Sequence, residues 1–299
     1  MKRIRIRTFA DARTRLQELG LTSLAELFIR YEATNQQLTR EEVVGRMATY
    51  LGAMRESLRR ATEQPNRTAS GLIDGGASKV ASLAARGGSL VGPQFSRFIQ
   101  NLLAVGEHNA CMGRIVAAPT AGAAASLPGA YLGVAELHQV PEQRVIEGLF
   151  VAGGLGEIIS LGASLSGSRH GCQAEAGSAS AMTAGAIASL FTADVTVIES
   201  AAAIALKNML GLVCDPVGGL VEVPCVKRGV MAGLNAIASA EMALAGITTT
   251  IPFDEVVVAM AEIGQALPVT LKETALGGLA ATPSGRRVKD ALVLTQPDR

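Results

Sequence analysis

Cysteine, histidine and aromatic residues are all scarce in this chain of 299 residues. It has 4 cysteines, 3 histidines and no tryptophan, and only 3% of its residues are aromatic. Four cysteines are too few for the disulfide framework of a small secreted protein. We therefore expect a cytoplasmic protein that folds around a hydrophobic core. Its reduced thiols would be either buried core groups or ligands.

Charge of one sign is also lacking, and so is a clear membrane segment. The formal net charge is +1, which gives no strong field to attract nucleic acid. The first seven residues are basic but lack the apolar segment of a secretory signal. Two apolar stretches, 145–165 and 229–247, contain glutamates, which are costly inside a bilayer. We expect neither a nucleic-acid partner nor a membrane span.

Small and aliphatic side chains are abundant instead. The chain has 33 glycines and is 48% hydrophobic, and no stretch alternates as a β-strand would. These features predict an all-α fold, a compact bundle of alanine- and glycine-rich helices with no substantial sheet. The expected helices cover residues 8–30, 40–60, 78–86, 94–112, 142–160, 172–190, 196–210, 227–245 and 253–267. Loops or turns are expected at 64–76, 118–122, 127–129, 162–171 and 277–283.

The first third of the chain is more polar than the rest. We interpret residues 1–70 as an N-terminal helical arm and residues 71–299 as a helical catalytic domain, which together can form one continuous domain. Within the arm, Thr39 precedes Glu41 and Glu42, a pattern typical of a helix N-terminus.

Three of the four cysteines stand at turns that contain glycine or proline. Cys172 follows a glycine, Cys214 comes two residues before a proline, and Cys225 follows a proline. Cys172 and Cys214 are 42 residues apart, and Cys225 follows 11 residues later. This is neither a ferredoxin spacing nor a paired zinc spacing, so three buried thiols explain it as well as a metal site does. Backbone amides at turns and helix starts stabilise thiolates, which favours ligands.

Long runs around these cysteines resemble one known family. They are residues 171–175 (GCQAE), 206–217 (LKNMLGLVCDPV) and 220–228 (LVEVPCVKR), together with 118–122 (APTAG) and 277–283 (GGLAATP). The runs closely resemble the alpha, or catalytic, subunit of the two-subunit iron–sulfur-dependent L-serine dehydratases. The resemblance extends from about residue 71 to about residue 285, and the first 60 residues match less distinctly.

The resemblance implies a cofactor, a partner and an activity. The cofactor would be a [4Fe–4S] cluster held by Cys172, Cys214 and Cys225, with the fourth iron open to substrate. The partner would be a separate beta subunit in a hetero- or homo-oligomer. Cys111 stands where the family has a small residue, so we interpret it as a bystander.

The implied activity converts L-serine to pyruvate and ammonia without pyridoxal phosphate. An open iron would act as a Lewis acid on the substrate hydroxyl while a base takes the α-proton. Three alternatives stay open: a lyase of the L-cysteine desulfidase type, an enzyme of the L-threonine dehydratase type, and an inactive cluster-bearing partner subunit.

Five further residues are candidate site residues, each with an ordinary structural explanation beside the functional one. Thr120 can donate a hydrogen bond to the substrate carboxylate, or can be a plain loop threonine. Lys207 and Asn208 can contact substrate, or can only cap a helix. His170 can act as the base or as a fourth cluster ligand. Lys227 can balance negative charge at the site, or can lie in solvent.

Two charged residues near the cysteines, Arg228 and Glu175, are also candidates for a role in the site. Arg228, next to Lys227, can balance a cluster or a substrate carboxylate. Glu175 lies three residues beyond Cys172 on the same helical face. It can contact the ligands of the site, or it can be an ordinary acidic residue of a first helical turn, where the helix dipole favours negative charge. The base can also come from the partner subunit.

Three positions depart from the family pattern. His170 replaces a small residue, Gly229 replaces an asparagine, and Phe253 replaces a common cysteine. We expect these changes to cluster near the active site. The substrate can therefore be another β-substituted amino acid instead of serine.

Overall fold

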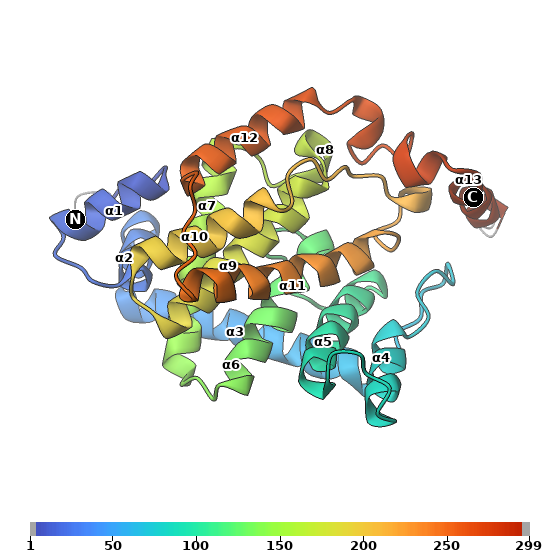
Figure 1. Cartoon of the computed structure of the whole chain (residues 1–299), viewed down its shortest axis with the longest axis horizontal. Helices are drawn as coiled ribbons and strands as arrows, with labels where there is room; N and C mark the ends of the chain where they lie inside the picture. The colour runs from blue at the N-terminus through green and yellow to red at the C-terminus, as the bar shows by residue number, and fades with distance from the viewer. Residues whose placement is uncertain (1–3, 295–299) are drawn as a thin grey trace.

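The computed structural model describes residues 4–294 and consists of helices joined by short loops (Figure 1). No strand occurs in this range, only two isolated β-bridges. The predicted all-α fold is therefore confirmed. The helices are α1 (Phe9–Glu18), α2 (Leu24–Gln36), α3 (Arg40–Glu63), α4 (Gly76–Ala85), α5 (Pro93–Ala110), α6 (Leu132–Leu137), α7 (Glu142–Gly162), α8 (Gly167–His170), α9 (Ser178–Phe191), α10 (Val195–Lys207), α11 (Cys225–Leu244), α12 (Phe253–Ala266) and α13 (Pro283–Leu294).

Six short 3-10 or π-helical turns lie between the longer helices. They are Ala121–Ala123, Leu127–Tyr131, Gln173–Gly177, Val217–Gly219, Val269–Leu271 and Gly278–Ala281. Four of them, all except Leu127–Tyr131 and Val269–Leu271, fall in or beside the sequence runs that carry the family resemblance. The functional segments of this fold are thus short turns held by long helices.

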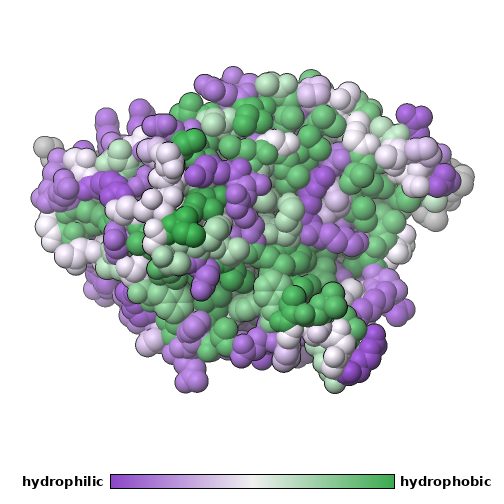
Figure 2. All heavy atoms as spheres, in the orientation of Figure 1, coloured by the Kyte–Doolittle hydropathy of each residue, from purple (hydrophilic) through white to green (hydrophobic). Residues whose placement is uncertain are grey.

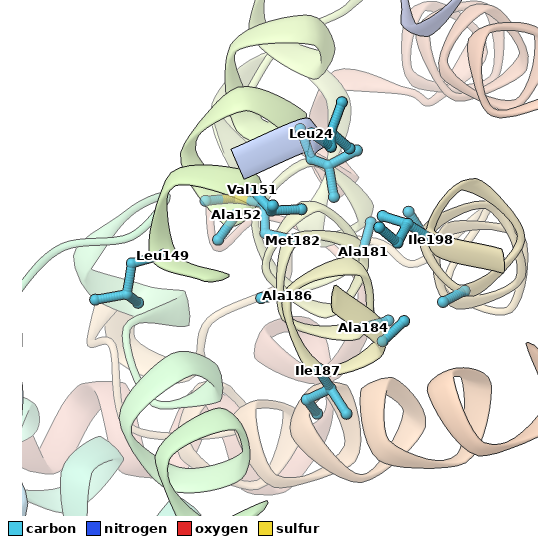
Figure 3. Close-up of a cluster of buried hydrophobic side chains, with 14 of the residues drawn as sticks. Leu24, Leu149, Val151, Ala152, Ala181, Met182, Ala184, Ala186, Ile187 and Ile198 are labelled. Carbon is cyan, nitrogen blue, oxygen red and sulfur yellow. The ribbon is translucent and has the colours of Figure 1, made fainter. Parts of the chain in front are cut away.

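Helix α9 forms the centre of the bundle and packs against α7, α10 and α11. Its side chains are mostly alanine and serine, and nearly all of them are buried. Figure 3 shows Ala181 facing Ile198 of α10, with Met182 toward Val151 of α7. A Cβ at Gly185 would lie 2.3 Å from a methyl carbon of Leu155, so glycine lets α7 approach α9 without moving that side chain. The expected close packing through small residues is present.

The N-terminal helices share the main hydrophobic core with the rest of the chain. Phe9, Leu27 and Leu51 belong to the same buried cluster as Val151. The side chain of Asp254, at the start of α12, accepts the backbone N–H of Phe9 at 2.7 Å and so ties α1 to α12. The division at residue 70 stays a prediction. Residues 1–3 and 295–299 of the two predicted units lie outside the described residues.

Three local predictions were wrong for identifiable reasons. Residues 8–30 form two helices, because Gly20 adopts a left-handed conformation (φ 60°) and Ser23 caps a new helix. The expected turn at 127–129 is a π-helical turn that leads into α6, with its proline in the first helical turn, where proline is tolerated. Helix α13 begins at Pro283, where only an irregular tail was expected.

Helix α7 is the one described helix that is long and apolar enough to cross a membrane by length and composition. Within its most apolar window, 67% of the residues are buried inside the protein. It packs against α2 on one side and α9 on the other. These contacts are those of a core helix, because the apolar surface faces other helices.

Candidate functional site

Cys172 is positioned by a glycine and by the segment before Cys214. Gly171 has a φ of 76°, and a Cβ there would lie 2.8 Å from the carbonyl oxygen of Leu212. The backbone N–H of Gln173 donates to that same oxygen at 3.0 Å. Glycine is needed at position 171 on both counts, because other residues avoid this conformation and lack the space. The chain then turns directly into the π-helical start of α9.

Cys214 and Cys225 are positioned by other elements. The backbone N–H of Cys214 donates to Leu271 O at 2.9 Å, and its carbonyl accepts the N–H of Glu273 at 2.8 Å. These two bonds join Cys214 to the segment 267–282 that follows α12. Cys225 is the first residue of α11. The helix expected from residue 172 begins there, and the helix expected from residue 227 begins two residues earlier, at Cys225.

The three thiols lie near one another beside the N-terminal end of α11, in a region that we call the cysteine pocket. Burial raises the pKa of the Cys172 thiol to about 11 and that of Cys225 to about 12. Burial also raises the pKa of Cys214, and the charge of Cys172 raises the pKa of both other thiols. Such mutual effects need thiols that are near neighbours. Three cysteines that are distant in sequence thus converge.

Arg228 is the cation of this pocket. It lies one helical turn beyond Cys225, and its charge opposes the effect of burial by lowering the pKa of Cys172. Its Nη1 donates to Val213 O at 2.8 Å. The same Nη1 lies 2.9 Å from Asp215 Oδ1, in an ion pair without hydrogen-bond geometry. Arg228 therefore holds the segment around Cys214 against α11.

Asp215 is buried and links this ion pair to the segment 267–282. Its Oδ2 accepts the backbone N–H of Leu279 at 2.7 Å. A Cβ at Gly278 would lie 2.3 Å from that oxygen, and Gly278 has a φ of 57°. The close approach therefore needs glycine at position 278.

Glu175 places a largely buried carboxylate beside the thiols. Its Oε1 accepts the hydroxyl hydrogen of Thr120 at 2.7 Å. Burial raises the pKa of Glu175, the Thr120 bond opposes this, and the charge of Glu273 adds to the rise. Carboxylate oxygens of Glu175 and Glu273 and the sulfur of Cys214 all lie within 4.8 Å of one another.

The residues of the pocket fit an iron–sulfur group. Thiolates are the ligands that such clusters use. Burial raises the pKa of the Cys172 thiol, and the Arg228 charge and the Ala176 backbone oppose that rise. The raised pKa values keep the buried thiols protonated until a cation offsets the cost of ionisation, and bound iron would supply that charge. A different donor set, the group of Glu175, Cys214 and Glu273, could also hold a metal ion.

Comparison with known proteins identifies the family. A family model described as serine dehydratase alpha chain matches residues 20–280. The chain belongs to this family. It is 44% identical over 266 residues to the "Probable L-serine dehydratase, alpha chain" of Bacillus subtilis, covering 89% of this chain and 88% of the relative. It is 37% identical over 264 residues to the "L-serine dehydratase, alpha chain" of Peptoniphilus asaccharolyticus, covering 88% and 90%.

A longer relative matches over a smaller share. The "L-serine dehydratase" of Streptomyces coelicolor is 44% identical over 186 residues, which cover 60% of this chain and 40% of that protein. Serine dehydratase alpha chain sequences therefore account for most of this chain, whereas they account for only part of some related proteins.

Among the residues predicted to contact substrate, Thr120 is connected to the thiol region, because it donates a hydrogen bond to Glu175. Lys207 and Asn208 bond elsewhere. Lys207 Nζ donates to Thr249 Oγ1 at 2.9 Å, and Asn208 Nδ2 donates to the side chain of Asn235 at 2.7 Å. Both contacts link helices or loops. Their proposed roles toward substrate stay predictions without a supporting contact in the described range.

His170 and Lys227 also face other elements. His170 packs against α12, where a Cβ at Gly264 would lie 2.5 Å from the Cβ of His170. Burial lowers the pKa of His170, and the charge of Lys272 adds to this. Lys227 is exposed, and its charge acts on Glu107. The catalytic roles of both groups stay predictions.

Cys111 and Gly229 differ in their position relative to the three thiols. Cys111 ends α5, and the charges that act on it are those of Glu107 and Glu222, not the other cysteines. Gly229 lines a narrow cleft together with Cys225. The roles expected of both residues stay predictions.

The expectation for Phe253 was wrong. This residue is fully buried in the main core, edge to face with Phe9 at 6.2 Å between ring centroids. It begins α12, and Gly264, which contacts His170, is eleven residues further along that helix, or roughly 16 Å. An aromatic side chain at position 253 serves packing.

Sequence reasoning gave too little weight to Arg228 and missed Glu273. The signal for Arg228 was present, because position i+3 from Cys225 shares its helical face whereas Lys227 at i+2 does not. Glu273 had no such signal. Glu273 reaches Cys214 only because the segment 267–282 folds back beside Cys214. The backbone turns at Glu273 itself, whose φ is positive (62°), and such a turn is usually predicted only at a glycine.

Proposed function

We propose that this chain dehydrates and deaminates L-serine to pyruvate and ammonia, with a [4Fe–4S] cluster bound by Cys172, Cys214 and Cys225. The observation that carries the proposal is the convergence of three thiols, two buried and one half-buried, beside an arginine, in a chain whose relatives are named L-serine dehydratase alpha chains. A cluster with one open iron would act as a Lewis acid toward the substrate hydroxyl.

The residues of the chain would prepare the pocket for this chemistry. Arg228 favours the thiolate of Cys172 and holds the Cys214 segment in place. Thr120 donates its hydroxyl hydrogen to Glu175 and so orients that carboxylate beside the thiols. Among the residues predicted to contact substrate, the contacts favour Thr120 over Lys207 and Asn208. The proton acceptor is proposed to be His170 or a group of the partner chain, with Lys227 as a positive charge that balances the cluster or the substrate carboxylate.

The proposal includes a cytoplasmic location and a separate beta chain. Two relatives carry the words "alpha chain" in their names, which supports a second chain. Apolar side chains also remain exposed on the segment next to Cys214: Val269 is 68% exposed and Leu276 is 63% exposed. Figure 2 shows that apolar side chains cover much of the displayed face, interrupted by groups of polar side chains. Exposed apolar surface of this kind is typical of a subunit contact.

The experiment is anaerobic reconstitution with iron and sulfide, followed by absorption spectra, iron and sulfide counts, and a pyruvate assay with L-serine. We expect cluster absorption and pyruvate formation for the wild type. Cys214→Ser should lose the cluster, and Cys111→Ser should keep it, because the Cys111 thiol is separate from the other three.

Each departure from this result has a distinct meaning. A fully loaded protein that releases pyruvate from L-cysteine but not from L-serine would be a desulfidase, and one that acts only on L-threonine would be a threonine dehydratase. Full loading with no turnover, even with the beta chain present, would mark an inactive subunit. Failure to bind iron at all would contradict the proposal.

A further inference from the structure

Glu175 is a half-buried carboxylate that pairs with no cation among the described residues. Burial raises its pKa, and the charge that acts on it is that of another carboxylate, Glu273. No ion pair involving Glu175 occurs within residues 4–294. The nearby cation, Arg228, is engaged with Val213 and Asp215 instead. A buried charge without a counter-charge is costly, so such groups are found where a ligand supplies the missing charge.

The carboxylate is held in one orientation by its neighbours. Oε1 accepts from Thr120 at 2.7 Å. Oε2 lies near Gly167, where a Cβ would stand 2.8 Å from that oxygen and 3.1 Å from the sulfur of Cys214. Gly122 lies on the other side, with 3.7 Å between its virtual Cβ and Oε1. Two glycines thus leave the carboxylate open beside the thiols, without side chains that would cover it.

All three thiols sense the charge of Glu175. It raises the pKa of Cys172, Cys214 and Cys225 alike. Glu273, in contrast, acts on Cys214 alone among the three, and its side chain is exposed. Glu175 is therefore the inner carboxylate of the pocket, and Glu273 lies at its rim.

An α-amino acid carries the missing charge. Serine has a carboxylate, a β-hydroxyl and an ammonium group, and only the ammonium group is a cation. We propose that Glu175 binds the α-ammonium group of the substrate and thereby selects α-amino acids over hydroxy acids of the same shape. This inference rests on the proposed function, because it assumes that the substrate reacts beside the three thiols.

The test compares Glu175→Gln with Glu273→Gln in anaerobic, cluster-loaded protein, together with its beta chain where activity requires one. Glutamine keeps the shape and can still accept from Thr120, so only the charge is removed. Two ligands are compared: L-serine, by KM and kcat, and 3-hydroxypropanoate, which is serine without its amino group, by calorimetric Kd. Iron content and the absorption spectrum are recorded for each variant without ligand.

For Glu175→Gln we expect the KM of L-serine to rise about 30-fold or more, as for loss of a buried charged partner. The Kd of 3-hydroxypropanoate should stay within about threefold, and iron content and spectrum should be unchanged. Glu273→Gln should raise the KM of L-serine by no more than about threefold, because solvent screens an exposed charge.

Three results would overturn the inference. Equal weakening of both ligands would make Glu175 a residue that only shapes the pocket. A changed spectrum without ligand would make it an iron ligand. An unchanged KM would remove it from substrate binding. Failure of the wild type to bind or convert L-serine would instead contradict the proposed function itself, and the inference with it.

Discussion

At the scale of single residues, the site depends on two kinds of position: those where an added methyl group would displace the ligands, and those where the loss of one charge would leave a partner unpaired. Gly167 illustrates the first kind. It begins α8, and it is the point where Glu175 and Cys214 meet. Arg228 illustrates the second kind, because one guanidinium group joins α11 to the backbone of Val213 and to buried Asp215.

Gly167→Ala should impair the pocket without unfolding the protein. The added methyl group would lie 3.1 Å from the sulfur of Cys214 and 2.8 Å from Glu175 Oε2, so one of them must move. We expect less than about half of the wild-type iron content after reconstitution, with normal far-UV circular dichroism. Gly52→Ala is the control, because nothing lies within 4 Å of a Cβ at that position. Full iron binding by Gly167→Ala would show that the pocket tolerates the displacement.

Arg228→Met should destabilise even the cluster-free protein. The side chain of Asp215 is only 3% exposed and that of Arg228 is 17% exposed, so the change leaves a buried carboxylate without its counter-charge. Loss of one partner of such a pair costs about 3–5 kcal/mol, which urea denaturation can measure. The double variant with Asp215→Asn should recover more than half of the loss. Additive losses in the double variant would mean that the two side chains are not coupled.

At the scale of helices, small residues allow the helices to pack closely, but neighbouring glycines can differ sharply in how much space surrounds them. In α7, Gly153 is exposed and nothing lies within 4 Å of a Cβ there. A Cβ at Gly154 would lie 2.3 Å from the ring of Phe28, which is buried. The same residue type therefore serves no packing role at one position and makes room for an aromatic ring at the next.

Alanine substitutions at these two positions should have effects of opposite sign. Gly153→Ala should raise the free energy of unfolding by about 0.5–1 kcal/mol, because alanine is the better helix former. Gly154→Ala should lower it by about 1–3 kcal/mol through overpacking against Phe28. Thermal or urea denaturation of the two variants checks both signs. A stabilising Gly154→Ala would contradict the packing of α2 on α7.

At the scale of the whole molecule, the cysteine pocket and the main core are separate. The largest hydrophobic cluster contains none of the three cysteines of the pocket, and Cys172 and Cys214 belong to a small cluster of their own. The helices should therefore fold without the iron–sulfur cluster, whereas the segments that hold the thiols should need the bound iron–sulfur cluster to become fully ordered.

Removal of the cluster should consequently have a local effect. We expect far-UV circular dichroism to change little, because α7, α9 and α10 pack through the main core. Hydrogen exchange should accelerate in three segments only, residues 171–177, 212–216 and 269–279, which bond to one another across the pocket. Loss of protection throughout α9 would instead show that the cluster supports the whole fold.

The helices themselves were predictable, and the errors have local causes. The expected helices at 40–60, 142–160 and 253–267 are present as α3, α7 and α12, because their composition and caps act within one element. Residues 8–30 failed at Gly20, where a single left-handed residue divides the stretch. Helix α13 was missed because the glycines and the proline of residues 277–283 predict a turn there.

The sequence alone determined the class of fold and the family, because composition, helix signals and long matched runs are properties of contiguous residues. It also determined which three cysteines to consider, since each stands at its own local turn. Tertiary structure decided which groups surround those thiols. Arg228 faces them and Lys227 does not, Glu273 arrives from a segment far along the chain, and Phe253 belongs to the core. The physical reason is that burial and charge act through space, and distances through space between separate elements are set only when the helices pack.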